Sequence, residues 1–195
     1  MIRLIDIIFS TLGILILMPF FILVSLIIKF NSKGPLIYKQ SRVGIYNSNF
    51  NVYKFRTMHI NSDRLGLLTV GGRDPRITSV GYYLRKYKLD ELPQLFNVLI
   101  GDMSIVGPRP EVRKYVDMYT PEQKRVLSIR PGITDWASIQ YRYENIILEK
   151  ATDPEKDYVN IIIPDKINYN LIYIEKYNVL EYLKIIFMTV WKIIF

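Results

Sequence analysis

The N-terminal part of the chain is one long run of apolar positions. Residues 7–28 contain no charged side chain. As a helix the run would measure roughly 33 Å at about 1.5 Å per residue, close to the thickness of a bilayer core. A signal peptide is the alternative, but no small-residue cleavage site follows before Lys29. We therefore expect residues 1–30 to form a membrane helix.

Pro19 lies in the middle of this run. Because proline removes a backbone donor and clashes with the preceding turn, we expect the helix to kink or break there. A straight helix would carry the N-terminus across the membrane, whereas a bent, re-entrant helix would return it. In the re-entrant form Arg3 would snorkel to headgroups on the same side as Lys29. The positive-inside rule places the basic remainder in the cytoplasm in both cases, and Arg3 favours the re-entrant form.

The pattern then changes to short strands. Residues 36–38 and 50–55 read as strands, and the turn residues at 44–49 separate them, so we expect a hairpin. Residues 66–72 read as a loop.

The second half of the chain has helical spacing. Residues 79–86 have helical character, and apolar positions 92, 95, 96 and 99 predict an amphipathic helix over 89–100 that ends at Gly101. Two prolines make residues 107–110 a loop. We expect a short helix at 121–129, a polar surface segment without periodicity at 144–157, and amphipathic helices at 167–195 that lie in the membrane interface.

Composition narrows the chemistry. The formal net charge of +8 favours an anionic partner such as lipid headgroups, nucleotide phosphates or nucleic acid. The chain has no cysteine and one histidine, His59, which excludes disulfides, thiolate zinc sites and cysteine nucleophiles. Any metal must be held mainly by oxygen, which indicates Mg²⁺ or a similar hard cation.

The adjacent carboxylates Asp90 and Glu91 begin the predicted helix at 89–100. Acidic residues at this position commonly only stabilise a helix N-terminus. Here, however, Arg85 precedes them, Lys54 lies on a predicted strand, and two prolines restrain Arg109. In such a setting one carboxylate can attack phosphorus while its neighbour holds Mg²⁺, and the helix N-terminus would keep the nucleophile ionised.

Six ordered motifs carry a resemblance to a known family. They are YKFRTM at 53–58, DPRIT at 74–78, LDELPQL at 89–95, GDMS at 101–104, GPRP at 107–110 and RPGIT at 130–134. In order and spacing the chain resembles the bacterial sugar transferases of the monotopic phosphoglycosyl transferase superfamily, from about Arg3 to the C-terminus.

The resemblance implies transfer of a phosphosugar from a UDP-sugar to undecaprenyl phosphate, with release of UMP, as the initiating step of surface polysaccharide, capsule or glycoconjugate synthesis. It implies that Asp90 is the nucleophile and forms a covalent phosphosugar intermediate, and that Glu91 holds Mg²⁺. Lys54, Arg85 and Arg109 would bind substrate phosphates. It also implies a re-entrant helix broken at Pro19 in the bacterial inner (cytoplasmic) membrane, with downstream glycosyltransferases as further partners.

The sequence departs from the family pattern at three places. Met18 replaces the serine that usually precedes the helix-breaking proline, Asp135–Ser138 replaces the usual continuation of RPGIT, and Asn170 replaces the aspartate of a Tyr-Asp pair. We expect the contacts with the sugar or the uridine near Asp135–Ser138 to differ from those of the family. No magnesium role is carried over to Asn170.

We therefore predict an α+β fold with a re-entrant helix at residues 1–30 and a catalytic domain at 31–195, which contains a small sheet and interfacial amphipathic helices. Three alternatives stay open: a glycosyltransferase that releases UDP, a non-enzymatic membrane protein, and an inactive homologue. A nucleic-acid binder would leave the apolar N-terminus unexplained, so we expect no nucleic-acid partner.

Overall fold

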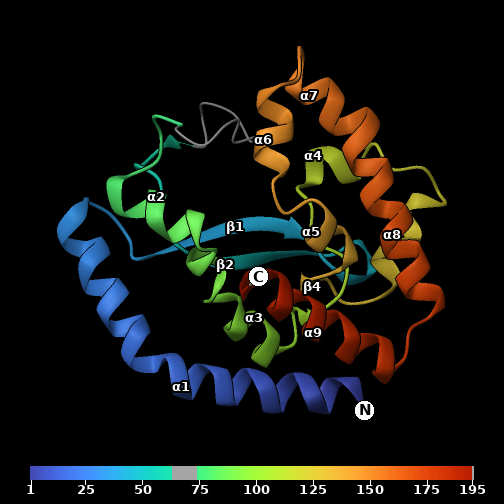
Figure 1. Cartoon of the computed structure of the whole chain (residues 1–195), viewed down its shortest axis with the longest axis horizontal. Coiled ribbons are helices and arrows are strands. Elements are labelled where there is room, and N and C mark those ends of the chain that lie inside the picture. Colours follow the sequence, from blue (N-terminus) through green and yellow to red (C-terminus); the bar gives the residue numbers. More distant parts are fainter. Residues whose placement is uncertain (63–73, 195) are drawn as a thin grey trace.

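The computed structural model describes residues 1–62 and 74–194, with side chains to residue 192; the loop predicted at 66–72 lies outside the described residues. The strands are β1 (Ile37–Val43), β2 (Asn49–Phe55), β3 (Ser104–Val106) and β4 (Gly132–Thr134). The helices are α1 (Ile2–Asn31), α2 (Ser79–Lys86), α3 (Gln94–Ile100), α4 (Arg113–Val116), α5 (Trp136–Gln140), α6 (Glu144–Glu149), α7 (Pro154–Asp157), α8 (Ile163–Glu175) and α9 (Val179–Ile194). This mixture of helices around small sheets confirms the α+β prediction (Figure 1).

The predicted hairpin is present as the antiparallel pair β1–β2, in which Ile37 lies opposite Phe55 and Val43 opposite Asn49. Its connection contains a turn at Ile45–Asn47, where Tyr46 and Asn47 adopt positive φ values of 54° and 60°. Helix α3 packs against β2 on one side and against α1 on the other. Helix α3 therefore connects the hairpin to the N-terminal helix.

A second sheet, which the sequence pattern did not predict, is the parallel pair β3–β4. Its strands meet next to two glycines, since a Cβ on Gly132 would come within 2.1 Å of the Gly107 nitrogen. Only glycine permits the two backbones to approach this closely. The pairing fixes the start of the predicted 107–110 loop beside β4.

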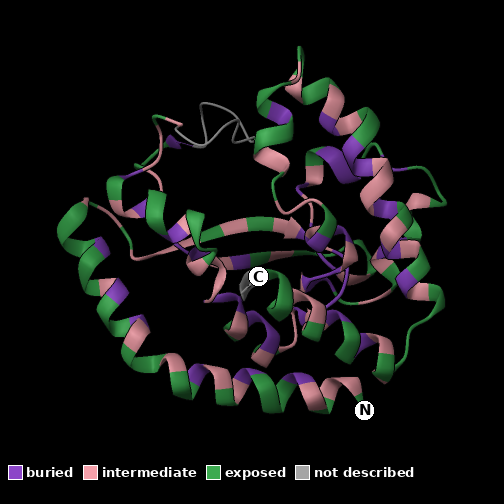
Figure 2. Cartoon of the chain, in the orientation of Figure 1, coloured by how far each residue is buried: buried purple, intermediate pink, exposed green. Residues whose placement is uncertain are grey.

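Helix α1 is continuous through Pro19 and changes direction part-way along its length (Figure 1). Of the two predicted effects, a kink or a break, the helix shows a bend and stays continuous. A kink is the usual effect of proline inside a helix. Within residues 1–62 and 74–194, α1 is the one helix long and apolar enough to cross a membrane, by length and composition. One stripe faces the protein, and the other keeps large apolar side chains exposed, including Leu12, Leu15, Ile16 and Leu23 (Figure 2).

Both ends of α1 are attached to the body of the protein. Arg3 donates to the carbonyls of Val98 and Leu99 at 2.6 and 2.9 Å, so it caps α3 instead of snorkelling to headgroups as the sequence suggested. Asp6 is 2% exposed and accepts hydrogen bonds from Ser104, Ile105 and Tyr182. At the far end, Arg56 donates to the Ser32 carbonyl at 2.7 Å. These polar contacts attach both the N-terminal and the C-terminal end of α1 to the rest of the protein.

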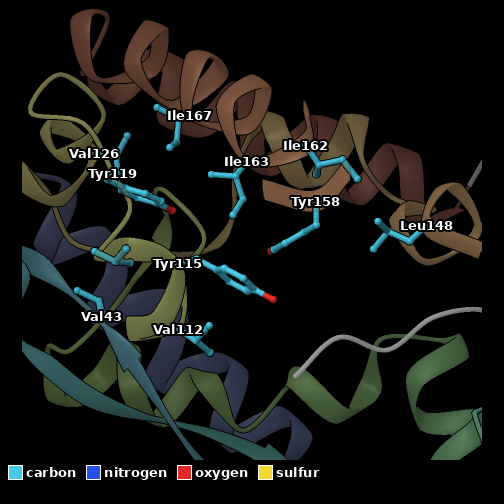
Figure 3. Close-up of a cluster of buried hydrophobic side chains, with 11 residues drawn as sticks. Val43, Val112, Tyr115, Tyr119, Val126, Leu148, Tyr158, Ile162, Ile163 and Ile167 are labelled. Atoms are coloured by element: carbon cyan, nitrogen blue, oxygen red, sulfur yellow. The ribbon is translucent and has the colours of Figure 1, made fainter. Parts of the chain in front are cut away.

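The largest hydrophobic cluster lies between β1, α4, the Gln123–Ser128 turn and α8 (Figure 3). Its buried members are Val43, Val112, Tyr115, Val116, Tyr119, Val126, Leu148, Tyr158, Ile162, Ile163 and Ile167. Helix α8 therefore directs apolar residues into the core. Helix α9 instead exposes Leu183, Phe187 and Trp191, and so fits the predicted interfacial helix.

Two local predictions need adjustment. The short helix expected at 121–129 is a 3-10 helix at Gln123–Ser128. The segment 144–157, predicted as a polar surface segment without periodicity, contains the two short helices α6 and α7. Asp153 caps α7 through the Lys156 amide, and Pro154 opens it, which is a standard helix start.

Candidate active site

The two carboxylates lie in a 3-10 turn, Leu89–Glu91, that precedes α3. The sequence predicted one helix over 89–100, but Pro93 has no N–H to continue the helical bonding and stands as the N-cap of α3. Lys88, just before the turn, has a positive φ of 58°. The predicted stop is correct, since Gly101 ends α3 with φ 101°. The dyad therefore occupies a tight turn between α2 and α3.

Glu91 is paired with two cations. Lys54 Nζ lies 2.9 Å from Glu91 Oε1, and Arg109 Nη1 donates to Glu91 Oε2 at 3.1 Å. Arg109 Nη2 also pairs with Oε1, which makes the arginine contact bidentate. Burial alone would raise the pKa of Glu91, but the charges of Arg109 and Lys54 hold this pKa well below its usual range. Glu91 is therefore ionised at neutral pH.

Asp90 is in a different environment. It is 6% exposed, and no salt bridge joins it to a cation within the part of the chain that is described. Burial, and then the charge of Glu91, raise the pKa of Asp90, while the charges of Lys54, Arg85 and Lys88 oppose the rise. We expected a helix N-terminus to keep this carboxylate ionised; burial in the turn acts in the opposite direction and raises the pKa of Asp90.

The predicted cations surround the dyad. Lys54 comes from β2, and burial lowers its pKa more than Glu91 raises it. Arg85 is in the last turn of α2, and its charge acts on Asp90. Arg109 follows β3, and the charge of Glu91 raises its pKa. The structure therefore brings all five predicted site residues into one electrostatic cluster.

Lys88 is a member of this cluster that sequence reasoning missed. Desolvation lowers its pKa, and its charge acts on both Asp90 and Glu91. The sequence signal for this role was the position of Lys88, two residues before Asp90. Pro93 begins α3 only after the dyad, so Lys88 lies in the preceding turn. Lys88 therefore adds a further positive charge that acts on both carboxylates.

Asn97 joins α3 to β2. It is fully buried, its Oδ1 accepts from the Tyr53 amide at 2.9 Å, and its Nδ2 donates to the Asn51 carbonyl at 2.7 Å. The side chain thus satisfies the free edge of β2 as another strand would. Since Lys54 follows Tyr53 directly, this contact sets the position of Lys54 relative to the turn.

The donor set near the dyad suits Mg²⁺. Magnesium is usually held by one or two carboxylates together with substrate phosphates and water, without a cage of many protein ligands. Glu91 is ionised, and the carboxylate of Asp90 is adjacent. No larger cluster of acidic or histidine side chains occurs among residues 1–62 and 74–194. A metal at Glu91 would require Lys54 and Arg109 to turn toward substrate phosphates.

In this arrangement the four basic residues can bind a phosphate group, and the buried carboxylate between them can attack its phosphorus. In a comparison with known proteins, the sequence model of the family described as bacterial sugar transferase matches residues 1–195. The chain belongs to the bacterial sugar transferase family. The motif-based family prediction is therefore confirmed.

Curated members of the bacterial sugar transferase family resemble the chain over most of its length. It is 36% identical to UDP-N-acetylgalactosamine-undecaprenyl-phosphate N-acetylgalactosaminephosphotransferase from Aeromonas hydrophila, over 97% of this chain and 42% of the relative. It is 37% identical to UDP-glucose:undecaprenyl-phosphate glucose-1-phosphate transferase from Escherichia coli (strain K12), over 96% of this chain and 39% of the relative. The uncharacterized sugar transferase EpsL from Bacillus subtilis (strain 168) is 36% identical over 86% of this chain and 74% of the relative. The chain thus spans about two fifths of the length of the first two relatives.

Proposed function

We propose that the protein transfers a phosphosugar from a UDP-sugar to undecaprenyl phosphate through a covalent intermediate on Asp90. The observation that supports this most is the contrast within the dyad. Glu91 is neutralised by Lys54 and Arg109, whereas Asp90 has no such direct partner among the described residues. A carboxylate without an ion pair retains its lone pairs for attack. Relatives named for the same transfer add support.

In the first step, an Asp90 carboxylate oxygen attacks the β-phosphorus of the UDP-sugar. The new bond joins this oxygen to the β-phosphorus, the bond between the β-phosphorus and the bridging oxygen breaks, and UMP departs with the bridging oxygen on its α-phosphate. In the second step, a phosphate oxygen of undecaprenyl phosphate attacks the same phosphorus and the bond to Asp90 breaks. The product is an undecaprenyl diphosphosugar, and Asp90 is regenerated.

The basic residues bind and orient the phosphates. Arg109 presents a planar guanidinium that matches two phosphate oxygens, while Lys54, Arg85 and Lys88 supply further positive charge. These charges lower the repulsion between the anionic nucleophile and the diphosphate. Mg²⁺, which Glu91 would hold, supplies additional charge neutralisation when bound.

The proposed setting is the cytoplasmic face of the bacterial inner membrane, where a soluble nucleotide sugar can meet a lipid phosphate. We assign residues 1–30 to a re-entrant membrane helix and 31–195 to the catalytic domain. The contacts of Arg3 and Asp6 with the body support this, because a helix that crossed the bilayer would carry both residues away from it. The product would initiate surface polysaccharide or glycoconjugate synthesis and would be extended by downstream glycosyltransferases.

The test is to incubate the purified protein with Mg²⁺ and a panel of UDP-sugars, with intact-mass detection of a phosphosugar adduct. The adduct and released UMP are expected with the wild type, and neither is expected with Asp90→Asn. Release of UDP would indicate a glycosyltransferase instead. An adduct on Asp90→Asn would remove Asp90 from the role, and undiminished UMP release after EDTA treatment would contradict the magnesium assignment.

A further inference from the structure

A small polar cavity lies behind the Arg109 loop. Its volume is about 30 Å³, and its polar lining includes Arg109, Asp135, Ser138, Lys166 and Asn170. The rest of the lining is mostly apolar, from Pro108, Val126, Ala137, Ile163 and Ile167, while Glu111 and Tyr119 add two further polar side chains. Two departures from the family pattern, at 135–138 and at 170, therefore meet in one cavity although they are far apart in sequence.

Two polar atoms of the cavity residues have no protein partner. Ser138 Oγ and Asn170 Oδ1 are buried without a hydrogen bond, and Asn170 is 5% exposed as a whole. Buried polar atoms nearly always have partners, because leaving them unpaired is costly. The Asn170 oxygen can only accept, and the Ser138 hydroxyl can both donate and accept. The group that satisfies both must carry an O–H or N–H donor.

The cavity is connected to the dyad through short contacts. Arg109, which pairs with Glu91 through its guanidinium, donates its backbone N–H to Asp135 Oδ2 at 3.2 Å. Asp135 Oδ1 accepts from the Ser138 amide at 2.6 Å and caps α5. Asp135 is fully buried, so this arrangement holds Ser138 in a fixed place relative to Arg109. A sugar attached to a phosphate at Arg109 would lie next to the cavity.

The size of the cavity limits what can enter. A water molecule needs about 10 to 15 Å³ of such volume, so the space accommodates two or three atoms other than hydrogen. A pyranose ring does not fit, but one hydroxyl or hydroxymethyl substituent does. Water that fills the cavity in the absence of substrate would be displaced by a group that reproduces its hydrogen bonds.

We propose that this cavity is a specificity pocket that receives a hydroxyl-bearing substituent of the transferred sugar, bound by Ser138 and Asn170. The proposal rests on the proposed function and adds to it the class of group by which the sugar is selected. A sugar without that hydroxyl leaves both buried atoms unpaired. Sites of this kind discriminate strongly against the analogue that lacks the group.

The experiment compares the preferred UDP-sugar with its deoxy analogues, each lacking one hydroxyl, in a UMP-release assay on the full chain. The variants are Ser138→Ala and the double variant Ser138→Ala, Asn170→Leu. Tyr173→Phe is the matched control, because Tyr173 is also on α8 and its hydroxyl is also buried without a partner, but it does not line the cavity.

The wild type is expected to favour the parent sugar over one deoxy analogue by about 10-fold or more in kcat/KM. The double variant should bring this ratio close to one, mainly by losing rate with the parent sugar, and Tyr173→Phe should keep the wild-type ratio. Ser138→Ala, which removes a single oxygen, should lower the ratio in part and serves if the double variant does not fold.

Two results would overturn the proposal while leaving the phosphosugar transfer intact: no analogue is discriminated by the wild type, or the wild-type ratio persists in every cavity variant. In either case the cavity holds only water. Failure of the wild type to release UMP from any UDP-sugar is a distinct result and would overturn the proposed function itself.

Discussion

Asp90 and Glu91 are adjacent in sequence, but their surroundings give them opposite effects on stability. Glu91 is stabilised as an anion by Lys54 and Arg109. Burial and the neighbouring negative charge instead raise the pKa of Asp90. A carboxyl group whose folded pKa lies above its unfolded value destabilises the fold once the pH exceeds the unfolded pKa. The dyad therefore combines a stabilising acid with a destabilising one.

This contrast predicts different outcomes for two conservative substitutions. Asp90→Asn removes the unfavourable buried charge, so we expect unchanged or higher thermal stability together with loss of UMP release. Glu91→Gln leaves Lys54 and Arg109 facing each other without their anion, and we expect a loss of about 2 kcal/mol, since partial exposure softens the cost of breaking a buried pair. Thermal unfolding in detergent measures both. Equal destabilisation by the two variants would contradict this account.

The pH dependence of kcat/KM should report on Asp90. Attack requires the ionised carboxylate, so the rate should fall as the pH drops through a pKa raised above the usual aspartate value. The charge of Lys54 lowers the Asp90 pKa, so Lys54→Met should move the acid limb to higher pH. Lys39→Met, on the neighbouring strand β1, is the control and should leave the limb in place. A limb that moves to lower pH in Lys54→Met would refute the assignment.

At the scale of elements, the sequence predicted what depends on local pattern. The β1–β2 hairpin follows from its apolar strands and turn residues, and α2 matches its predicted bounds at Ser79–Lys86. The β3–β4 pair could not be predicted, because each strand has three residues and their parallel pairing depends on contact between distant glycines. The break before α3 was readable at Pro93, and the helix start at Asp153–Pro154 was readable too.

The candidate site shows the same division. The motifs identified Lys54, Arg85, Asp90, Glu91 and Arg109, whereas the pairing of Glu91 with both Lys54 and Arg109 is a tertiary contact across three segments. Lys88 was missed because its role depends on the left-handed turn that directs the chain into the dyad. The cavity at Ser138 and Asn170 was likewise invisible, since only packing of α5 against α8 brings these residues together.

Asn97 provides a test of how α3 is held. Asn97→Ala would leave the Tyr53 amide and the Asn51 carbonyl without partners at the edge of β2. We expect a loss of about 1 to 3 kcal/mol in the free energy of unfolding, because two partly buried hydrogen bonds are lost. Asn31→Ala removes one exposed side-chain hydrogen bond to Ser79 and should change stability by less than about 0.5 kcal/mol. Similar effects of the two substitutions would show that Asn97 does not hold the elements together.

At the scale of the whole molecule, the attachment of both ends of α1 predicts the membrane topology. A cysteine at position 2 should not react with an impermeant thiol reagent added to intact cells, and should react after the cells are permeabilised. The chain has no native cysteine, so the signal comes from that position alone. Labelling of intact cells would reject the re-entrant arrangement.

The polar anchors of α1 can be tested in the same assay. Asp6→Leu together with Arg3→Leu removes the contacts with Ser104, Ile105, Tyr182 and α3. We expect part of the population to become labelled from outside, because the longer apolar helix then loses its tie to the body. Lys29→Leu, at the other end of the same helix, should not increase labelling at position 2.

The bend in α1 has a consequence for the lipid. A helix that enters and leaves through one leaflet adds cross-sectional area to that leaflet alone, as a wedge does. The opposite leaflet is unchanged, so the protein should bind best where lipids on its own side are already spread apart, as with other amphipathic insertions that respond to curvature. Protein added to the outside of vesicles should therefore partition more strongly into small vesicles than into large ones of the same composition.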